Sequence, residues 1–265
     1  MTAEILVIRT PSGLSGDMML AGLTRLLGLS ADALDERVQR IGVPAVQGVV
    51  SVIPRFVAGI GGWASEVSLP DEHIHRCLED ILQLIAHSQL HESARAVACA
   101  AFGRLAQVEA EIHGVPPNQI TFHEVGALDS ILDVCLVAEL YAELGSPQVV
   151  CSPLPVCDGV VRCQHGLLAT PAPAVLRMLE GVPVYGIDAD CETVTPTALA
   201  MLHALQATFG GWPALTVRRT ARVYGARVIP GVPNGAIFAC GPAVEAMHRP
   251  AVVSERDTPH NHLGN

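Results

Sequence analysis

Hydrophobic and polar positions follow strand spacing at the start of the chain and helical spacing soon after it. The run Ile5–Arg9 predicts a β-strand, and the apolar residues that follow Asp17 have helical spacing as far as Gly28. Small residues between these two stretches predict a loop. The chain therefore opens with a strand, a loop of small residues and a helix.

The next part of the chain alternates between helical patterns and one stretch with the spacing of strands. We expect helices over 31–41, 73–86 and 92–113, the last of which is followed by a glycine and two prolines. Residues 47–68 alternate weakly, which predicts strands around a turn at Gly59–Gly62.

The remaining pattern predicts an α/β fold, a mixed-topology sheet with flanking helices. A short extended segment at 120–122 precedes a helix over 125–144, and a last helix is expected over 198–207 before two further strands. We assign residues 1–245 to one domain and 246–265 to a mobile polar tail.

Composition excludes several classes of protein. Half of the 265 residues are hydrophobic, so the chain can bury a substantial core. The net charge is −10 at pH 7 and no lysine is present, which argues against binding to nucleic acid or to an anionic membrane. The sequence shows neither a long uncharged apolar run nor a signal-peptide pattern, so we expect a cytoplasmic protein with reduced cysteines.

The loop between the first strand and the first helix is a candidate anion site. Its residues Ser12, Gly13, Ser15 and Gly16 are small, and the amide groups at a helix N-terminus attract negative charge. The alternative is an ordinary tight turn in which Asp17 caps the helix.

A second candidate is the segment that contains His73, His75 and Cys77. If this segment is extended, alternate residues face one side, and two imidazoles with a thiolate suit a metal such as nickel or zinc. The alternative is that the histidines are exposed and that Cys77 belongs to the core.

A third candidate combines side chains from two predicted helices and their junction. Carboxylates among apolar neighbours are costly to bury unless a cation or a hydrogen-bond network compensates them, which favours a buried polar site. The alternative is that Asp129 caps a helix and His123 is a satisfied core residue. The candidates are Glu109, His113, His123, Glu124, Asp129 and Asp133.

A fourth group lies in the second half of the chain. His165 and Glu192 add metal-ligand types, while Thr195 and Thr197 can bond a phosphate or a ribose at a helix start. For the two threonines, helix N-capping is the alternative that the pattern favours.

Six stretches of this sequence resemble the LarC-type nickel-insertion proteins of nickel-pincer nucleotide cofactor biosynthesis. They occur in the family's order over roughly residues 5–205, and FHEVGALDSILD is the most specific of them. The stretches are SGLSGDMMLAGL, HRCLEDI, FHEVGALDSILDV, SPLPVCDGVV, HGLLATPAPAVLRMLEG and ETVTPTALAML.

The resemblance implies that the protein inserts nickel into a pyridinium bisthiocarboxylate mononucleotide, forming a nickel–carbon bond while CTP is consumed. We expect His123, Glu124 and Asp17 to act in catalysis, His123 or Glu124 as the base. The small residues of the first loop, with Thr195 and Thr197, are expected to bind the mononucleotide. The expected metal ligands are His75, Cys77, His113, His123, Asp129, Asp133, His165 and Glu192.

The chain departs from the family pattern at several positions. The family's Asp-Cys after the first strand is replaced by Arg9 and Thr10, its HRH reads His75-Arg76-Cys77, and a late glycine loop carries Arg227. We expect the family's C-terminal CTP-binding domain to be absent.

These departures lead to specific expectations. A separate protein is expected to supply CTP binding if the chain acts as a metal-insertion lyase, and we expect a homo-oligomer. The alternatives are a non-catalytic nickel or cofactor carrier, and a diverged enzyme that acts on another small phosphorylated molecule.

Overall fold

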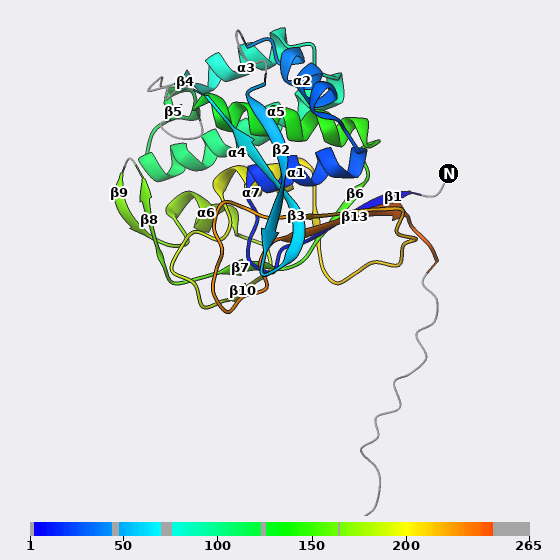
Figure 1. The fold of residues 1–265 in the computed structure, drawn as a ribbon. Helices are drawn as coiled ribbons and strands as arrows, with labels where there is room; N and C mark the ends of the chain where they lie inside the picture. The colour runs from blue at the N-terminus through cyan, green and yellow to red at the C-terminus, as the bar shows by residue number, and fades with distance from the viewer. Residues whose placement is uncertain (1–2, 44–47, 70–75, 123–125, 164, 246–265) are drawn as a thin grey trace, which may run out of the picture.

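A seven-stranded mixed sheet organises the protein in the computed structural model, which describes residues 3–43, 48–69, 76–122, 126–163 and 165–245 (Figure 1). Neighbouring strands follow one another in the order β11 (Thr208–Phe209), β6 (Gln148–Cys151), β1 (Glu4–Arg9), β13 (Ala236–Pro242), β12 (Arg219–Val223), β3 (Ile60–Val67) and β2 (Val50–Val57).

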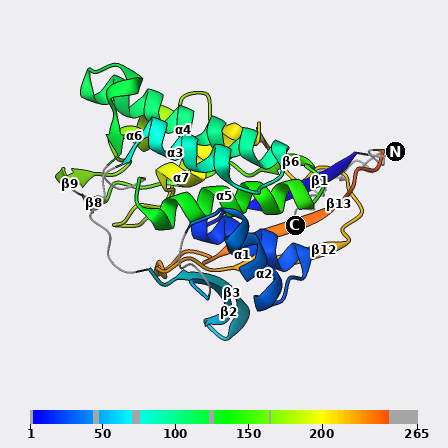
Figure 2. The same ribbon diagram turned by 90° about the horizontal axis from the view of Figure 1, so that it is seen from above.

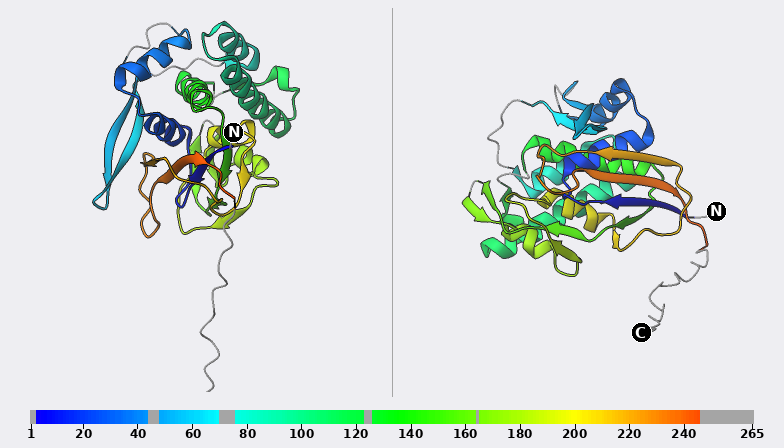
Figure 3. Two further views of the ribbon diagram at one scale, coloured as in Figure 1. Left: turned by 90° about the vertical axis from the view of Figure 1, so that its right-hand side faces the viewer. Right: turned by 60° about the horizontal axis from the view of Figure 1, so that its bottom comes forward.

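Strand β1 lies in the interior of this sheet, between β6 and β13, and its side chains are apolar on both faces. It pairs in parallel with β6 and antiparallel with β13, and Ile5, Leu6, Val7 and Ile8 are all buried. At the edge of the sheet, β2 and β3 form a long hairpin that extends away from the helices (Figure 3). The predicted α/β class with a mixed-topology sheet and flanking helices is confirmed.

The helices are stacked on one face of the sheet (Figures 1 and 2). The first helix contacts β3, β12 and β13, the fifth packs on the first, and the fourth covers the fifth and the seventh. None of the described helices combines the length and the apolarity needed to cross a bilayer. The helices are α1 (Gly16–Leu27), α2 (Ala31–Arg40), α3 (Leu78–His87), α4 (Glu92–His113), α5 (Leu128–Glu143), α6 (Pro173–Met178) and α7 (Pro196–Ala204).

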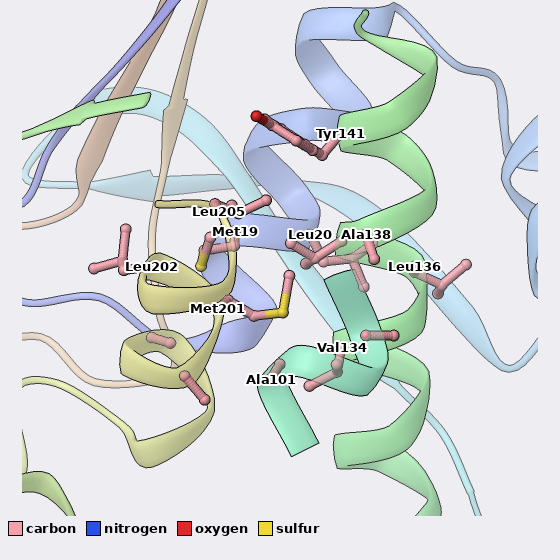
Figure 4. Packing of buried hydrophobic residues seen from close by; sticks show 14 of the residues in the cluster. Met19, Leu20, Ala101, Val134, Leu136, Ala138, Tyr141, Met201, Leu202 and Leu205 are labelled. Atoms are coloured by element: carbon pink, nitrogen blue, oxygen red, sulfur yellow. The ribbon is translucent and has the colours of Figure 1, made fainter. Parts of the chain in front are cut away.

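The core lies where α1, α5 and α7 meet. Leu20 of α1 lies beside Ala138 of α5, Met19 points toward α7, and Val134 of α5 and Met201 of α7 belong to the same cluster (Figure 4). All five are essentially inaccessible to water, and burying a large apolar side chain contributes about 1.5–3 kcal/mol. This packing fixes the starts of α1 and α7 relative to the middle of α5.

Three short two-stranded ladders surround the sheet and the helices. The pair β8 (Val160–Cys163) and β9 (Gly166–Ala169) forms a hairpin at the edge of the molecule, on the left in Figure 1. The other ladders are β4 (Arg76–Cys77) with β5 (Thr121–Phe122), and β7 (Leu154–Val156) with β10 (Val184–Gly186).

Several predicted boundaries are wrong where distant parts of the chain interact. The helix expected from residue 73 begins only at Leu78, because Arg76 and Cys77 pair with β5 and the amide of Cys77 donates to Asp80. Likewise, the helix expected over 125–144 starts at Leu128.

Other boundaries differ by small shifts. The tip of the β2–β3 hairpin is at Ala58 and Gly59, so the turn begins one residue earlier than expected. Helix α7 starts at Pro196, two residues earlier than expected. The tail over 246–265 lies outside the described residues.

Candidate functional site

The loop after β1 lines a cavity of about 260 Å³, which we call the loop cavity. Its walls come from three segments distant in sequence: the first loop, the segment before α7, and the loop after β12. Predicted site residues on these walls are Ser12, Gly13, Ser15, Asp17, Glu192 and Thr195. The structure thus brings the first and the fourth predicted groups together.

Gly13 allows the loop to lie directly against the segment before α7. Its φ is +123°, and a Cβ atom at this position would overlap the carbonyl oxygen of Thr193. The adjacent Leu14 amide donates to Thr193 O at 2.9 Å, and the Thr195 amide donates to Leu14 O at 3.1 Å. These two bonds hold both walls of the cavity in register.

Thr195 caps α7, as the alternative interpretation of the two threonines expected. Its Oγ1 accepts a hydrogen bond from the Ala198 amide at 3.3 Å and lies 3.0 Å from Thr197 Oγ1. Because Thr195 also lines the loop cavity, capping fixes a hydroxyl oxygen at the cavity wall.

Carboxylates gather at the start of α1. Asp17 lies in the first turn and accepts a hydrogen bond from Ser15 Oγ. Behind it, a Cβ atom on Gly16 would lie 2.9 Å from Asp133 Oδ2 and 3.4 Å from Thr197 Oγ1. Gly16 and Thr197 therefore belong to the floor of the site, next to a carboxylate from the middle of α5.

The surroundings of the Asp133 carboxyl disfavour its charged form. Its Oδ1 is buried and has no hydrogen-bond partner among the described residues. Burial raises the pKa of Asp133 well above its usual value, and the negative charges of Asp17 and Asp129 raise it further. The carboxyl is therefore biased toward its protonated form.

Asp133→Asn is expected to stabilise the metal-free protein at pH 7 by about 1–2 kcal/mol, because it removes a carboxyl that resists ionisation. The unfolded chain ionises Asp133 above its ordinary pKa of 3.8, while the folded chain still holds the proton. The wild type therefore loses stability relative to the variant as pH rises from about 4 toward the raised pKa. Urea unfolding at pH 4 and pH 7 measures this difference.

Asp188→Asn is the matched control for this prediction, since Asp188 is exposed and its charge is not among those that raise the pKa of Asp133. It should change stability by no more than about 0.5 kcal/mol at either pH. A destabilised Asp133→Asn variant would contradict the unfavourable environment inferred for the carboxylate.

A second hollow, of about 290 Å³, adjoins the loop cavity through Glu192, which lines both. We call it the histidine hollow, because His113 and His165 stand with their ring centroids 5.1 Å apart. Glu109 Oε2 lies 3.5 Å from His113 Nε2, and Cys163 lines the same hollow.

The donors of the histidine hollow are the types that bind nickel or zinc: imidazole, thiolate and carboxylate. They come from the end of α4, from the turn between β8 and β9, and from the segment before α7. Three predicted metal ligands, His113, His165 and Glu192, are thus brought to one place.

A different trio has the tighter geometry of a metal site. Among the described residues, His91, Glu139 and Glu143 are the group whose donor atoms all lie within 4.8 Å of one another. Arg40 Nη1, however, lies 2.8 Å from Glu139 and 3.2 Å from Glu143. Arg37 also pairs with Glu143, so this group is an ion-pair network between α2 and α5 that is already neutralised.

The other predicted ligands lie elsewhere. Cys77 is the residue before α3 and lines neither hollow, and Asp129 is exposed and accepts from the Ser130 amide. His75, His123 and Glu124 lie outside the described residues. Arg76 and Phe122, which follow His75 and precede His123 in the chain, are paired across β4 and β5.

Two residues that line these hollows were not among the predicted site residues. Cys163 stands two positions before His165, a strand spacing that signals a shared side, but Cys163 was not among the expected ligands. Arg227 lines the loop cavity from the loop after β12, and the sequence marked it only as a departure from the family's glycine loop.

Comparison with known proteins adds independent information. The profile described as "Nickel insertion protein" matches residues 6–255. A putative nickel insertion protein of Geotalea daltonii is 34% identical over 91% of this chain and 62% of its own length. The corresponding protein of Syntrophobacter fumaroxidans is 40% identical over 84% of this chain and 56% of its own length.

A third relative carries a more specific name. The pyridinium-3,5-bisthiocarboxylic acid mononucleotide nickel insertion protein of Nocardioides sp. is 38% identical over 84% of this chain and 56% of its own length. The chain therefore spans about 56–62% of the length of these relatives. No solved structure shows significant similarity.

Proposed function

The chain belongs to the nickel insertion protein family, and we propose that it inserts nickel into a pyridinium bisthiocarboxylate mononucleotide. This substrate stands in the name of the Nocardioides relative. One observation carries the proposal: Glu192 is a wall shared by a cavity of small residues and a hollow of metal-ligand residues. A metal ion and a small molecule bound in these two places would be neighbours.

Nickel is the cargo in this proposal, and the histidine hollow is its place of entry. His113, His165 and Glu192 supply two imidazoles and a carboxylate, and Cys163 can add a thiolate. These donors are spread around the hollow rather than gathered within 4.8 Å, so they form an incomplete coordination sphere. An incomplete sphere suits a transfer site, because the sulfur atoms of the substrate can compete for the ion.

The loop cavity is the proposed site for the mononucleotide. Ser12, Gly13 and Ser15 place backbone and hydroxyl groups at one wall, and Thr195 places a hydroxyl at the other. Gly16 and Thr197 lie behind these walls, next to Asp133. A cavity of about 260 Å³ is close to the lower end of the range of small-molecule sites, about 300–1,000 Å³.

Formation of a nickel–carbon bond requires a base. The electron pair of the ring C–H bond becomes the C–Ni bond, the proton leaves, and nickel keeps its oxidation state. We propose His123 or Glu124 as the acceptor of that proton, and we propose that Asp17, which lines the loop cavity, also acts in catalysis. On this mechanism the chain is a metal-insertion lyase.

The relatives are longer than this chain, and we infer that their additional residues supply the CTP binding that the reaction requires. We propose that a separate CTP-binding protein completes the activity of this chain. A cytoplasmic location and a homo-oligomeric state remain part of the proposal.

The experiment mixes the purified chain with Ni²⁺ and the bisthiocarboxylate mononucleotide. The mixture is tested with and without CTP and with and without the C-terminal part of a full-length relative. Mass spectrometry should show a product that has gained one nickel and lost hydrogen, and only in mixtures that contain the chain. Nickel binding without product in every mixture would favour the carrier alternative, and mononucleotide binding without nickel binding would favour the diverged enzyme.

A further inference from the structure

A third hollow, of about 500 Å³, opens beside the loop cavity. We call it the arginine hollow, because Arg162 of β8 and Arg227 of the loop after β12 both line it. Arg227 and Cys191 line the loop cavity as well, so one ligand can extend through both spaces.

The two arginines differ from most others in this protein, because they are exposed and have no hydrogen-bond acceptor among the described residues. Arg37 and Arg40, by contrast, pair with glutamates of α5, and Arg177 pairs with Glu111. Arginine guanidinium groups bind phosphate through paired N–H donors. In a chain with a net charge of −10, two unengaged arginines at one hollow mark a place for an anion.

The walls of the arginine hollow also fit the rest of such a ligand. Val160, Leu167 and Val228 line it and are 51%, 61% and 51% exposed. The exposed Asp190 is the carboxylate among its lining residues, which leaves one net positive charge. Cationic groups beside exposed apolar side chains match an anion attached to a less polar body.

The loop cavity, in contrast, is a poor place for a phosphate. Asp17 and Glu192 line it against a single cationic side chain, Arg227, and the carboxyl of Asp133 lies behind Gly16. In the loop itself, the amides of Gly13 and Leu14 already donate to Thr10 O and Thr193 O. The positive end of α1 therefore faces carboxylates, and a phosphate dianion there would be repelled.

We propose that the phosphate of the bound mononucleotide lies between Arg162 and Arg227 in the arginine hollow, while its ring and ribose occupy the loop cavity. This inference rests on the proposed function for the choice of substrate, but it assigns the phosphate to a different place from the Ser12–Gly16 loop. The loop then contacts the uncharged part of the ligand.

The test uses nicotinic acid mononucleotide and nicotinic acid riboside, which differ by the phosphate, titrated without nickel by calorimetry. The wild type should bind the mononucleotide at least about 10-fold more tightly than the riboside, since a hydrogen bond to a charged group contributes that much or more. Arg162→Ala and Arg227→Ala should each weaken mononucleotide binding about 10-fold and change riboside binding less than about twofold.

Arg218→Ala is the matched control, because Arg218 is also exposed but pairs with Glu4 at the other end of β12. It should leave both affinities unchanged. If the arginine variants lost affinity equally for the mononucleotide and the riboside, or lost none, the phosphate would not lie in the arginine hollow. The assignment of the ring and ribose to the loop cavity would still stand. A wild type that bound neither probe would overturn both, and nickel titration of the same sample would show separately whether the metal site survives.

Discussion

The double variant His113→Ala, His165→Ala is expected to bind Ni²⁺ at least about 100-fold more weakly than the wild type. Both imidazoles line the histidine hollow, and their rings are 5.1 Å apart. Changes that only disturb the residues behind metal ligands already cost about 10–100-fold in affinity, so loss of two ligands should exceed that range. Calorimetric titration of the purified chain with Ni²⁺ measures the effect.

His87→Ala is the control for this variant. His87 is an exposed histidine of α3 whose Nδ1 lies 2.7 Å from Gln83 O, and it lines neither of the two proposed cavities. Its loss should leave nickel affinity unchanged. If the double variant bound nickel as the wild type does, the metal would have to enter elsewhere and the histidine hollow would lose its proposed role.

Gly13→Ala is expected to lower the free energy of unfolding by about 3 kcal/mol or more. Two costs add: the backbone has a φ of +123°, and the new Cβ would overlap Thr193 O. Relief requires the loop to separate from the segment before α7, which breaks the hydrogen bond from Leu14 N to Thr193 O. Urea unfolding followed by circular dichroism measures the loss, and mononucleotide binding should disappear with it.

Gly28→Ala separates the two costs. Gly28 ends α1 with a φ of +67°, but a Cβ atom there would meet nothing within 4 Å. Only the backbone cost of about 1 kcal/mol should remain, and ligand binding should be retained. Equal destabilisation by the two substitutions would show that the close contact with Thr193 is unimportant.

Local sequence patterns predicted the elements well where their boundaries depend on local chemistry. The helix over 92–113 is confirmed at both ends. Its C-terminal end was predictable because Gly114 adopts the left-handed conformation that ends α4. The strand–loop–helix opening is also confirmed as far as Gly28. The start of α3 was predicted wrongly because β4 pairs with β5 just before this helix, and a local pattern does not contain such pairing between distant segments. The start of α5 was also predicted too early.

The chemical types at the site were also visible in the sequence, but their grouping was not. Glu109 and His113 are four positions apart in the helix predicted over 92–113, a spacing that places them on one helix face, and their contact at 3.5 Å agrees with it. The sequence offered no reason to separate Cys77 and Asp129 from His113 and His165. It also gave no reason to single out Arg162, and it marked Arg227 only as a departure from the family pattern.

By itself, the sequence determined the α/β class, the family, and the presence of histidine, thiol and carboxylate donors. Only the tertiary structure decided that the Ser12–Asp17 loop meets Glu192 and Thr195, and that His113 meets His165. The reason is physical. The spacing of residues reports backbone periodicity over a few turns, whereas contacts between distant segments depend on tertiary packing. In this protein those contacts depend on the common core of α1, α5 and α7, and on Gly13, which lets its loop touch the segment at Thr193.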